Sequence, residues 1–514
     1  MKRLIVSLAV LSLLATGACK DKKANPTSQP IATPVDPDAE GTPEVKPDPK
    51  PEPPKVTPTT PDAPFRQNAP AAGPAVAVVP PKPKEFTLKN GLKVMLIERN
   101  ELPLVSLSLM FRTGSEQNPK GKAGLASMVA AMLDEGTKTR ASLVISDEIE
   151  NLGMDYYANT DYDYTELGMG SVKETFDASL ALFGDILQNP IFDDKEFARV
   201  KEERLTGLKT QKDRPAIMNN NTLIDVLYGP THPYGQPEGG TEASITSITK
   251  KDLQDFHKKN FVPSNAVLVL VGNINEADAK SKLEAQFATW KGAAPKLTKT
   301  TTTAAKPGAK VYFIEKENAP QSAMRVALVG IERANADYFP AQVMNAILGG
   351  IFSSRLNLNL REKHAWTYGA RSGFTYRKAA GPFSASADVQ SDHAIESIDE
   401  TLSELTRISA AEVTDEELSL AKSALAQTFI GAFESNAATA STFGRLAMFN
   451  FPLDYYESFA KNINAVTKAD IQRVAKAYVR VYEVVIVIVG PKSIEEGLKK
   501  FGTVEKRDAF GKKL

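Results

Sequence analysis

Ile248-Thr-Lys-Lys-Asp-Leu-Gln254 has a near copy later in the chain, Val466-Thr-Lys-Ala-Asp-Ile-Gln472. Each stretch leads into a fully apolar run that ends in Val-Gly, Ala266–Gly272 after the first copy and Val484–Gly490 after the second. Continuous apolar runs of this length predict buried strands. Two matching pieces at the same offset predict an internal repeat of about 200 residues per copy. The alternative, coincidence between two unrelated α+β domains, leaves the shared offset unexplained.

The order of the other predicted elements is also similar in the two copies. The first copy begins with Phe86–Glu98, which predicts a hairpin around the tight turn Asn90-Gly91. Thr249–Asn260 predicts a helix with a Thr cap and Asp252 three residues later. Three segments of the second copy correspond to segments of the first. The predicted strand Ser322–Gly330 corresponds to Val105–Phe111. The predicted helices Ile395–Ile408 and Thr414–Phe429 correspond to Phe176–Leu187 and Asp194–Lys212.

The first 84 residues predict a targeting segment followed by a linker. Residues 1–19 have a charged start, an apolar run from Leu4 to Ala15 and a small-residue end, as in a secretory signal too short to span a bilayer. Cys19 closes this segment at a position that resembles the lipobox of bacterial lipoproteins, in which the Cys is lipidated. The alternative is an ordinary secretory peptide. Residues 20–84 carry more than half of the chain's 33 prolines and predict a disordered tether.

Charge and length limit the remaining possibilities. The 62 Lys and Arg residues equal the 62 Asp and Glu residues, so nothing in the formal charge indicates a nucleic-acid partner. A single cysteine cannot form an intramolecular disulfide. The 514 residues, 42% of them hydrophobic, fit more than one folded domain. We place these domains at residues 85–292 and 309–505, joined by a linker at 293–308 that is rich in Thr, Lys and Ala.

Gly124-Leu-Ala-Ser-Met-Val-Ala-Ala-Met-Leu-Asp-Glu-Gly-Thr137 predicts an amphipathic helix that ends at Gly136. Taken alone, this is a buried helix and nothing more. The segment resembles the zinc motif of the inverted-zincin peptidases, the family of pitrilysin, insulysin and mitochondrial processing peptidase. In that family it reads roughly Gly-Leu-Ala-His-x-x-Glu-His-Met-Leu-x-x-Gly-Thr, in which the two His bind zinc and the Glu is the general base.

The residues that would carry this chemistry are replaced here. The two His positions and the Glu position hold Ser127, Ala131 and Ala130, none of which can bind zinc or act as a base. The family's third ligand is a Glu on the helix that here spans Asp194–Lys212, where either Glu203 or Arg204 matches it. The resemblance therefore implies a degenerate zinc motif.

The histidines give no other metal site. The chain has four, and no two lie within five residues of each other, so no His-x-x-x-His pair forms on a helix. His393-Ala-Ile-Glu396 has a suitable spacing but is followed by Ser397, and a surface His on a helix is the better interpretation. No general base lies near Ser127 in the sequence, so we interpret it as a substituted ligand rather than a nucleophile. We expect no metal or other cofactor in this chain.

The second copy keeps a different motif. Leu348-Gly-Gly-Ile-Phe-Ser-Ser-Arg-Leu356 is followed by Asn359-Leu-Arg-Glu-Lys-His-Ala-Trp-Thr-Tyr-Gly369, similar to the family's Gly-Gly-x-x-x-Ser-Arg-Leu and Leu-Arg-Glu-x-x-x-Leu-x-Tyr. In the family the Arg and Tyr hold the substrate backbone and help to stabilise the tetrahedral intermediate at the zinc of the other half. The resemblance gives these roles to Arg361 and Tyr368, a guanidinium and a phenol that can donate to an oxyanion. The alternative is that Arg361 pairs with an acid such as Glu362, and Tyr368 is only a strand residue.

The resemblance covers about residues 85–505 and implies an α+β fold of two homologous domains. Each would be a mixed sheet with helices packed on it, in a clam-like arrangement. Some bacterial members split the site between a zinc-bearing chain and a chain that carries the Arg/Tyr pair. We therefore expect a zinc-less subunit of a heterodimeric peptidase, lipid-anchored at the bacterial cell envelope, with zinc only in its partner and peptides as substrates. The alternative is a stand-alone envelope protein that binds peptides or acts as a scaffold, without catalysis.

Overall fold

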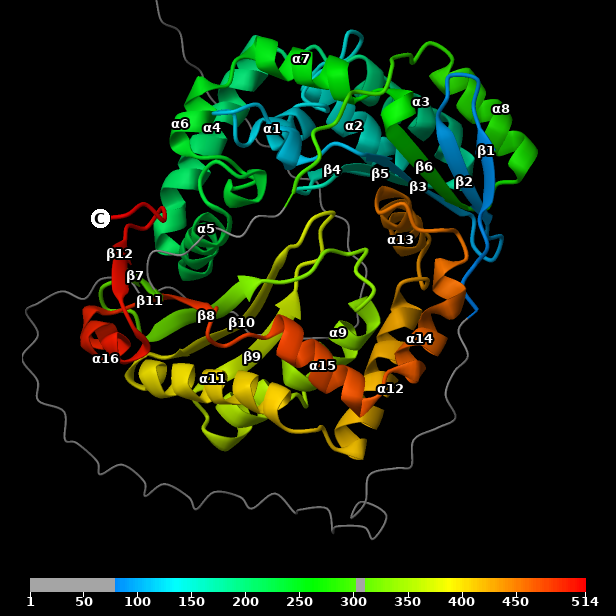
Figure 1. The fold of residues 1–514 in the computed structure, drawn as a ribbon. Helices are drawn as coiled ribbons and strands as arrows, with labels where there is room; N and C mark the ends of the chain where they lie inside the picture. The colour runs from blue at the N-terminus through cyan, green and yellow to red at the C-terminus, as the bar shows by residue number, and fades with distance from the viewer. Residues whose placement is uncertain (1–78, 302–309) are drawn as a thin grey trace, which may run out of the picture. The chain divides into compact units, whose positions relative to one another are not determined.

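The protein is described by a computed structural model that covers residues 79–301 and 310–514. The predictions for the signal segment, for Cys19 and for most of the tether lie outside these residues. Two six-stranded mixed sheets organise the described chain (Figure 1). In spatial order the first sheet comprises β1 (Lys84–Thr87), β2 (Lys93–Glu98), β6 (Ala266–Gly272), β3 (Leu104–Phe111), β5 (Thr165–Val172) and β4 (Asp155–Thr160). The second comprises β12 (Val504–Arg507), β7 (Val311–Glu315), β11 (Val485–Gly490), β8 (Gln321–Val329), β10 (Pro382–Gln390) and β9 (Thr367–Phe374).

The predicted repeat is confirmed by the order of these strands. In each sheet the apolar strand that ends in Val-Gly, β6 or β11, lies between a parallel neighbour and an antiparallel one. The sheets differ at one edge, because β1 runs antiparallel to β2 whereas β12 runs parallel to β7. β1 comes from a hairpin, as the Asn90-Gly91 turn predicts, and Gly91 has the positive φ of 88° that such a turn requires. β12 instead comes from the end of the chain.

Helices cover both sheets. The helices of the first half are α1 (Leu125–Ala131), α2 (Ser142–Leu152), α3 (Phe176–Gln188), α4 (Asp194–Lys209), α5 (Pro215–Tyr228), α6 (Glu242–Ser247), α7 (Lys250–Asn260) and α8 (Glu276–Phe287). Those of the second half are α9 (Tyr338–Asn345), α10 (Arg355–Asn357), α11 (Ala394–Ala410), α12 (Asp415–Gly431), α13 (Asn436–Met448), α14 (Phe459–Ala465), α15 (Lys468–Tyr478) and α16 (Glu495–Leu498). No helix in the described ranges is both long and apolar enough to cross a membrane.

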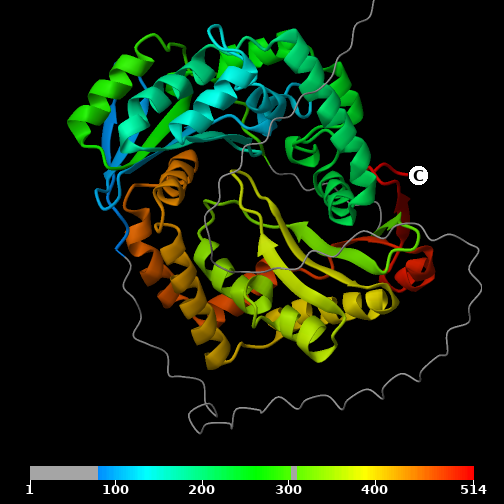
Figure 2. The same cartoon turned by 180° about the vertical axis from the view of Figure 1, so that it is seen from behind.

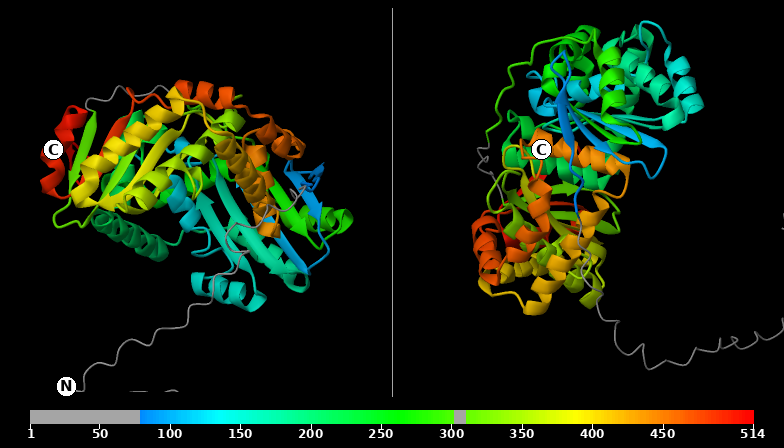
Figure 3. Two further views of the ribbon diagram at one scale, coloured as in Figure 1. Left: turned by 90° about the horizontal axis from the view of Figure 1, so that it is seen from below. Right: turned by 90° about the vertical axis from the view of Figure 1, so that its right-hand side faces the viewer.

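The capped helices α7 and α15 begin as the repeated Thr-Lys-x-Asp pattern predicts. In each, the Thr hydroxyl accepts from the backbone N–H of the Asp three residues later, while that Asp side chain accepts from the Thr backbone N–H. This capping box satisfies two backbone donors at the helix start, and such a cap stabilises a helix by about 1 kcal/mol. Beside the second sheet, α11 lies along β8 and β10 and is the yellow helix of Figure 3.

Each half of the chain contributes one helix to the sheet of the other half. α13 packs on β3 and β6 of the first sheet, and α5 packs on β8 and β11 of the second (Figures 1 and 2). This exchange explains why β6 and β11 are apolar on both faces. In β6, Leu268 and Leu270 face the first half's own core, whereas Val267, Val269 and Val271 pack with residues of α13.

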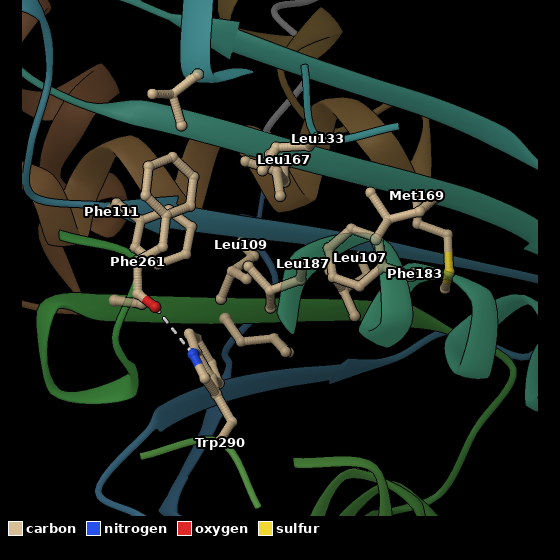
Figure 4. Close-up of a cluster of buried hydrophobic side chains, with 14 of the residues drawn as sticks. Leu107, Leu109, Phe111, Leu133, Leu167, Met169, Phe183, Leu187, Phe261 and Trp290 are labelled. Atoms are coloured by element: carbon tan, nitrogen blue, oxygen red, sulfur yellow. Dashed lines mark hydrogen bonds between the residues drawn. The ribbon is translucent and has the colours of Figure 1, made fainter. Parts of the chain in front are cut away.

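The core of the first half lies between its sheet and helices such as α3 and α7. Leu107, Leu109 and Phe111 of β3 are at most 2% exposed and meet Phe183 and Leu187 of α3 (Figure 4). At the edge of this cluster the indole N–H of Trp290 donates to the carbonyl oxygen of Phe261 at 2.9 Å (Figure 4). The buried indole therefore keeps a hydrogen-bond partner, as a polar group inside a core requires.

Helix α1 is shorter than the sequence predicts. It ends at Ala131, with Met132 as its C-cap, rather than at Gly136. Met132 and Leu133 remain fully buried, so the apolar spacing reports burial beyond the end of the helix. The chain bends at residues 133–135 instead, and Gly136 takes a φ of 127° that L side chains rarely adopt. Similarly, α4 ends at Lys209, and residues up to Asp213 form a 3₁₀ turn before Pro215 begins α5.

Candidate functional site

The degenerate zinc motif lies on α1, against helix α4. The Ser127 hydroxyl is 3.0 Å from the carbonyl oxygen of Gly124 and 3.1 Å from that of Glu238, either of which can accept its proton. The guanidinium of Arg204, on α4, donates to the same hydroxyl oxygen at 3.4 Å. Ala130 is buried and Ala131 is half-buried. The first predicted set of positions is thus brought together, with an arginine beside it.

The two candidates for the third-ligand position have different surroundings. Glu203 has a side chain that is 61% exposed and pairs with Arg199 at 2.8 Å. Arg204 is the residue that reaches Ser127. A zinc site needs neutral imidazole or carboxylate ligands, and here a hydroxyl, two methyl groups and a guanidinium cation stand around the position. These residues do not fit a zinc ion. Among the described residues, no group of three or more His, Cys, Asp or Glu side chains could hold a metal.

A cavity of about 480 Å³ opens beside the degenerate motif. Ala131 of α1 lines it, together with Val200, Glu203, Arg204 and Leu208 of α4, and with Arg214 and Ile217 at the start of α5. Burial lowers the pKa of Arg204, because removing water from around the guanidinium disfavours its charge. Burial likewise raises the pKa of Asp134 to about 6 and that of Glu238 to about 7. The region therefore holds several ionisable groups whose charged forms are disfavoured by poor hydration.

The retained motif of the second half follows a different backbone path. Two π-helical stretches, Ala346–Gly350 and Leu358–Lys363, flank the short helix α10. π-helical turns are rare and occur frequently at functional sites. Arg361 lies in the second stretch, and Tyr368 lies in β9, the edge strand of the second sheet.

Buried polar side chains hold this segment in place. Arg355 forms a two-pronged ion pair with Glu417 of α12, at 2.7 and 2.9 Å, and this pairing lowers the pKa of Glu417. The Asn357 side-chain oxygen accepts from the backbone N–H of Ala370 in β9 at 3.2 Å. The Asn359 amide donates to Glu404 of α11 at 2.9 Å. Sequence reasoning did not identify these positioning residues, although polar side chains alternating with leucines in Arg355-Leu-Asn-Leu-Asn359 are a recognisable sign of them.

The two predicted functional residues of this segment remain accessible. Tyr368 is 91% exposed. The Arg361 guanidinium lies 4.6 Å from the ring of Phe352, itself 68% exposed, and 3.5 Å from a Glu362 carboxylate oxygen. The pairing of Arg361 with Glu362 that the alternative interpretation predicts is thus present, but long and partly solvated. The described contacts do not join Arg361 to Tyr368 or to the degenerate motif.

The four histidines are dispersed, as the sequence predicts. His257 is half-buried in the first half, where its poorly hydrated surroundings lower its pKa to about 4. His364 and His393 stack on the two sides of Trp366, at 4.0 and 5.1 Å between ring centres. His393 is half-buried and lies at the N-terminal cap of α11 rather than on the helix surface, because the indole covers it. His232 stacks on Tyr228.

Comparisons with known proteins place this arrangement in a family. The profile described as "Insulinase (Peptidase family M16)" matches residues 93–228, and that described as "Peptidase M16 inactive domain" matches residues 247–425. A Rickettsia felis protein called an uncharacterized zinc protease is 26% identical over 70% of this chain and 85% of its own length. A probable mitochondrial-processing peptidase subunit beta of Schizosaccharomyces pombe is 24% identical over 80% of this chain and 92% of its own length.

Solved structures agree. A Pseudomonas fluorescens structure described as a peptidase M16 inactive domain superposes with a TM-score of 0.74 at 29% identity, covering 80% of this chain and 98% of that one. A protease from Helicobacter pylori shares the fold with the same TM-score at 22% identity. Both halves of the repeat are thus matched by profiles of one family, and a solved structure described with the same family name covers 80% of the chain. The chain belongs to the insulinase family of peptidases, M16, as a member without the zinc ligands.

Proposed function

We propose that this chain is the zinc-less subunit of a two-chain peptidase and completes the active site of a zinc-bearing relative. The observation that carries the proposal is a contrast within one molecule. The zinc-motif positions are replaced by Ser127, Ala130 and Ala131, whereas the second half retains Arg361 and Tyr368 in a segment held by the ion pair of Arg355 with Glu417. The anchors hold the segment while leaving two hydrogen-bond donors accessible to a ligand, which supports a binding role for them.

Arg361 and Tyr368 supply the chemistry of this proposal. A guanidinium and a phenol at the edge of the second sheet can donate hydrogen bonds to a peptide carbonyl and to the oxyanion that forms when water attacks it. Preorganised donors of this kind lower the barrier because they are already oriented when charge develops. In the proposed complex the partner chain would hold the zinc, which would supply an activated water, and this chain would bind and orient the peptide.

Purification from the native envelope tests the proposal. A tag on this chain should recover a family member with an intact His-x-x-Glu-His motif. Mixing the two purified chains should produce peptidase activity that neither chain shows alone. Recovery of the chain as a monomer or homodimer, with no activity gained on adding any zinc-bearing relative from the same genome, would support a stand-alone peptide-binding protein instead.

The envelope location belongs to the same proposal and depends on the first 84 residues. Lipid on Cys19 would anchor the chain, and the proline-rich residues 20–84 would hold the folded part away from the membrane. Metabolic labelling with a palmitate analogue should mark the wild-type protein and leave Cys19→Ser unlabelled. A wild-type chain that is secreted without label would contradict the lipid anchor and leave the two-chain proposal standing.

A further inference from the structure

We propose that the cavity beside α1 binds a carboxylate group of a peptide, with Arg204 as its anchor. This cavity lies beside the replaced zinc-motif positions, whose residues do not fit a zinc ion. Its cationic group is instead the guanidinium of Arg204, which reaches Ser127 from α4. A guanidinium presents paired N–H donors that match the two oxygens of a carboxylate.

Arg204 has no acidic partner in the described part of the chain. Its one hydrogen bond goes to the neutral hydroxyl of Ser127, at 3.4 Å. The nearest guanidinium on the same helix has the opposite surroundings, since Arg199 pairs with Glu135, Glu196 and Glu203 at 2.5 to 2.8 Å. Glu135, Glu196 and Glu203 are therefore already engaged by Arg199, and the half-buried Arg204 has no carboxylate partner among the described residues. A poorly hydrated charge without a counter-charge is costly, and an incoming anion would remove that cost.

A second guanidinium lines the same cavity. Arg214 is the N-cap residue of α5, and its side chain makes no ion pair or hydrogen bond with the described residues. The cavity thus has one arginine on α4 and a second, exposed one immediately before α5. An anion between them would complete the pairing of both groups.

The other residues that line the cavity favour some anions over others. Val200, Leu208 and Ile217 make part of the lining apolar, while Glu135 and Glu203 add negative charge at the rim. Nearby carboxylates oppose a doubly charged anion such as phosphate more strongly than a singly charged one. The apolar wall favours a carboxylate that carries an aliphatic group. A peptide end with an apolar last residue has this character, and a volume of about 480 Å³ suits a few residues.

This inference does not depend on a partner chain. Binding belongs to this chain alone, and it is measured without peptidase activity, so its failure would leave the two-chain proposal untouched. The carboxylate can come from two sources, the α-carboxylate at a peptide's C-terminus or the side chain of Asp or Glu. The peptides described next separate these sources.

Titration calorimetry with the isolated wild-type chain tests the proposal first. The probes are acetyl-Ala-Ala-Leu with a free C-terminus, the same peptide with a C-terminal amide, and acetyl-Ala-Ala-Glu with a C-terminal amide. We expect the free acid to bind at least about tenfold more tightly than its amide, the effect of one charge-assisted hydrogen bond. Binding of the glutamate peptide would assign the site to side-chain carboxylates instead. Equal binding of free acid and both amides, or no binding, would overturn the proposal.

Variants then assign the effect to Arg204. Arg204→Gln should remove the preference for the free acid, and Arg214→Gln should reduce it. Lys209→Gln is the matched control, because it removes a positive charge from the same helix at an exposed residue outside the cavity lining. A preference that survives in Arg204→Gln and equals that of the control would contradict the assignment. The comparison of peptides on the wild-type chain holds even if a variant folds poorly.

Discussion

Arg204 and Arg355 are two poorly exposed arginines with opposite surroundings, one in each half of the molecule. Arg355 is 9% exposed and makes a two-pronged ion pair with Glu417, which also caps α12. Arg204 lies beside the degenerate zinc motif, and its one side-chain hydrogen bond in the described part of the chain goes to a hydroxyl. The paired arginine holds a segment in position, whereas the unpaired one is available to a ligand. Each half of the molecule thus has its own arrangement of charge around its motif.

Rebuilding the zinc motif should have the largest effect, because it replaces the unpaired Arg204 with a metal ligand. We expect Ser127→His, Ala130→Glu and Ala131→His combined with Arg204→Glu to bind one zinc per chain, measured as metal content after dialysis. The same three changes with Arg204 retained should bind zinc on the order of 10³-fold more weakly, because the third ligand is missing and a cation stands close to the metal.

The matched control places the fourth change elsewhere on α4. Lys209→Glu alters the charge by the same amount at an exposed residue. It should not substitute for Arg204→Glu. If it restores zinc equally well, net charge rather than the position of Arg204 would explain the result.

Breaking the paired arginine should have the next largest effect. Arg355→Ala leaves Glu417 without its partner and releases α10 from α12, so we expect the free energy of unfolding to fall by about 3 kcal/mol. Arg204→Ala removes an uncompensated charge and should change the free energy of unfolding by less than about 1 kcal/mol. Urea unfolding of both variants measures the difference. Equal losses would show that Arg204 also has a structural partner.

Arg361→Ala tests whether the retained segment contributes to peptidase activity as well as to structure. Its side chain is not needed to hold the segment, because Arg355, Asn357 and Asn359 do so. We therefore expect peptide turnover by the reconstituted two-chain enzyme to fall on the order of 10²-fold, as for the loss of an oxyanion donor, while the unfolding transition stays unchanged. Lys363→Ala, an exposed cation in the same π-helical stretch, serves as control. Full activity of Arg361→Ala would exclude a catalytic contribution.

Much of the fold follows from the sequence, because the features that specify it are local. The apolar runs ending at Gly272 and Gly490, the Asn90-Gly91 turn and the capped helices each carry their own signal, and the structure confirms them. The exchange of α5 and α13 between the sheets could not be predicted. Both helices have an apolar face, and nothing in that face specifies which sheet it packs against.

The site was predicted less completely, for a related physical reason. A motif identifies which residues are replaced, as at Ser127, Ala130 and Ala131, and which are kept, as at Arg361 and Tyr368. The role of an arginine depends on whether a carboxylate reaches it, and the two carboxylate oxygens that hold Arg355 come from a residue 62 positions away. The pattern also placed the end of α1 at Gly136 rather than Ala131, because apolar spacing continues where the chain is buried but no longer helical.

The smallest predicted effect concerns pH and contrasts the carboxylates beside the two arginine sites. Burial raises the pKa of Glu238 to about 7, so its contribution to stability is present when it is protonated and is lost as the pH rises through about 7. Arg355 lowers the pKa of Glu417, so that contribution is present above the usual carboxylate pKa and is lost as the pH falls through its folded value. Between pH 5 and 8 we expect wild type to lose about 2 kcal/mol relative to Glu238→Gln, which has no proton to release. Glu417→Gln should instead be less stable than wild type at neutral pH, with a difference that shrinks in acid. Urea unfolding of the wild type and the two variants across this pH range measures both differences. Parallel pH profiles for wild type and Glu238→Gln would contradict the expectation. They would show that Glu238 is solvated and that the region around Ser127 is wetter than its burial indicates.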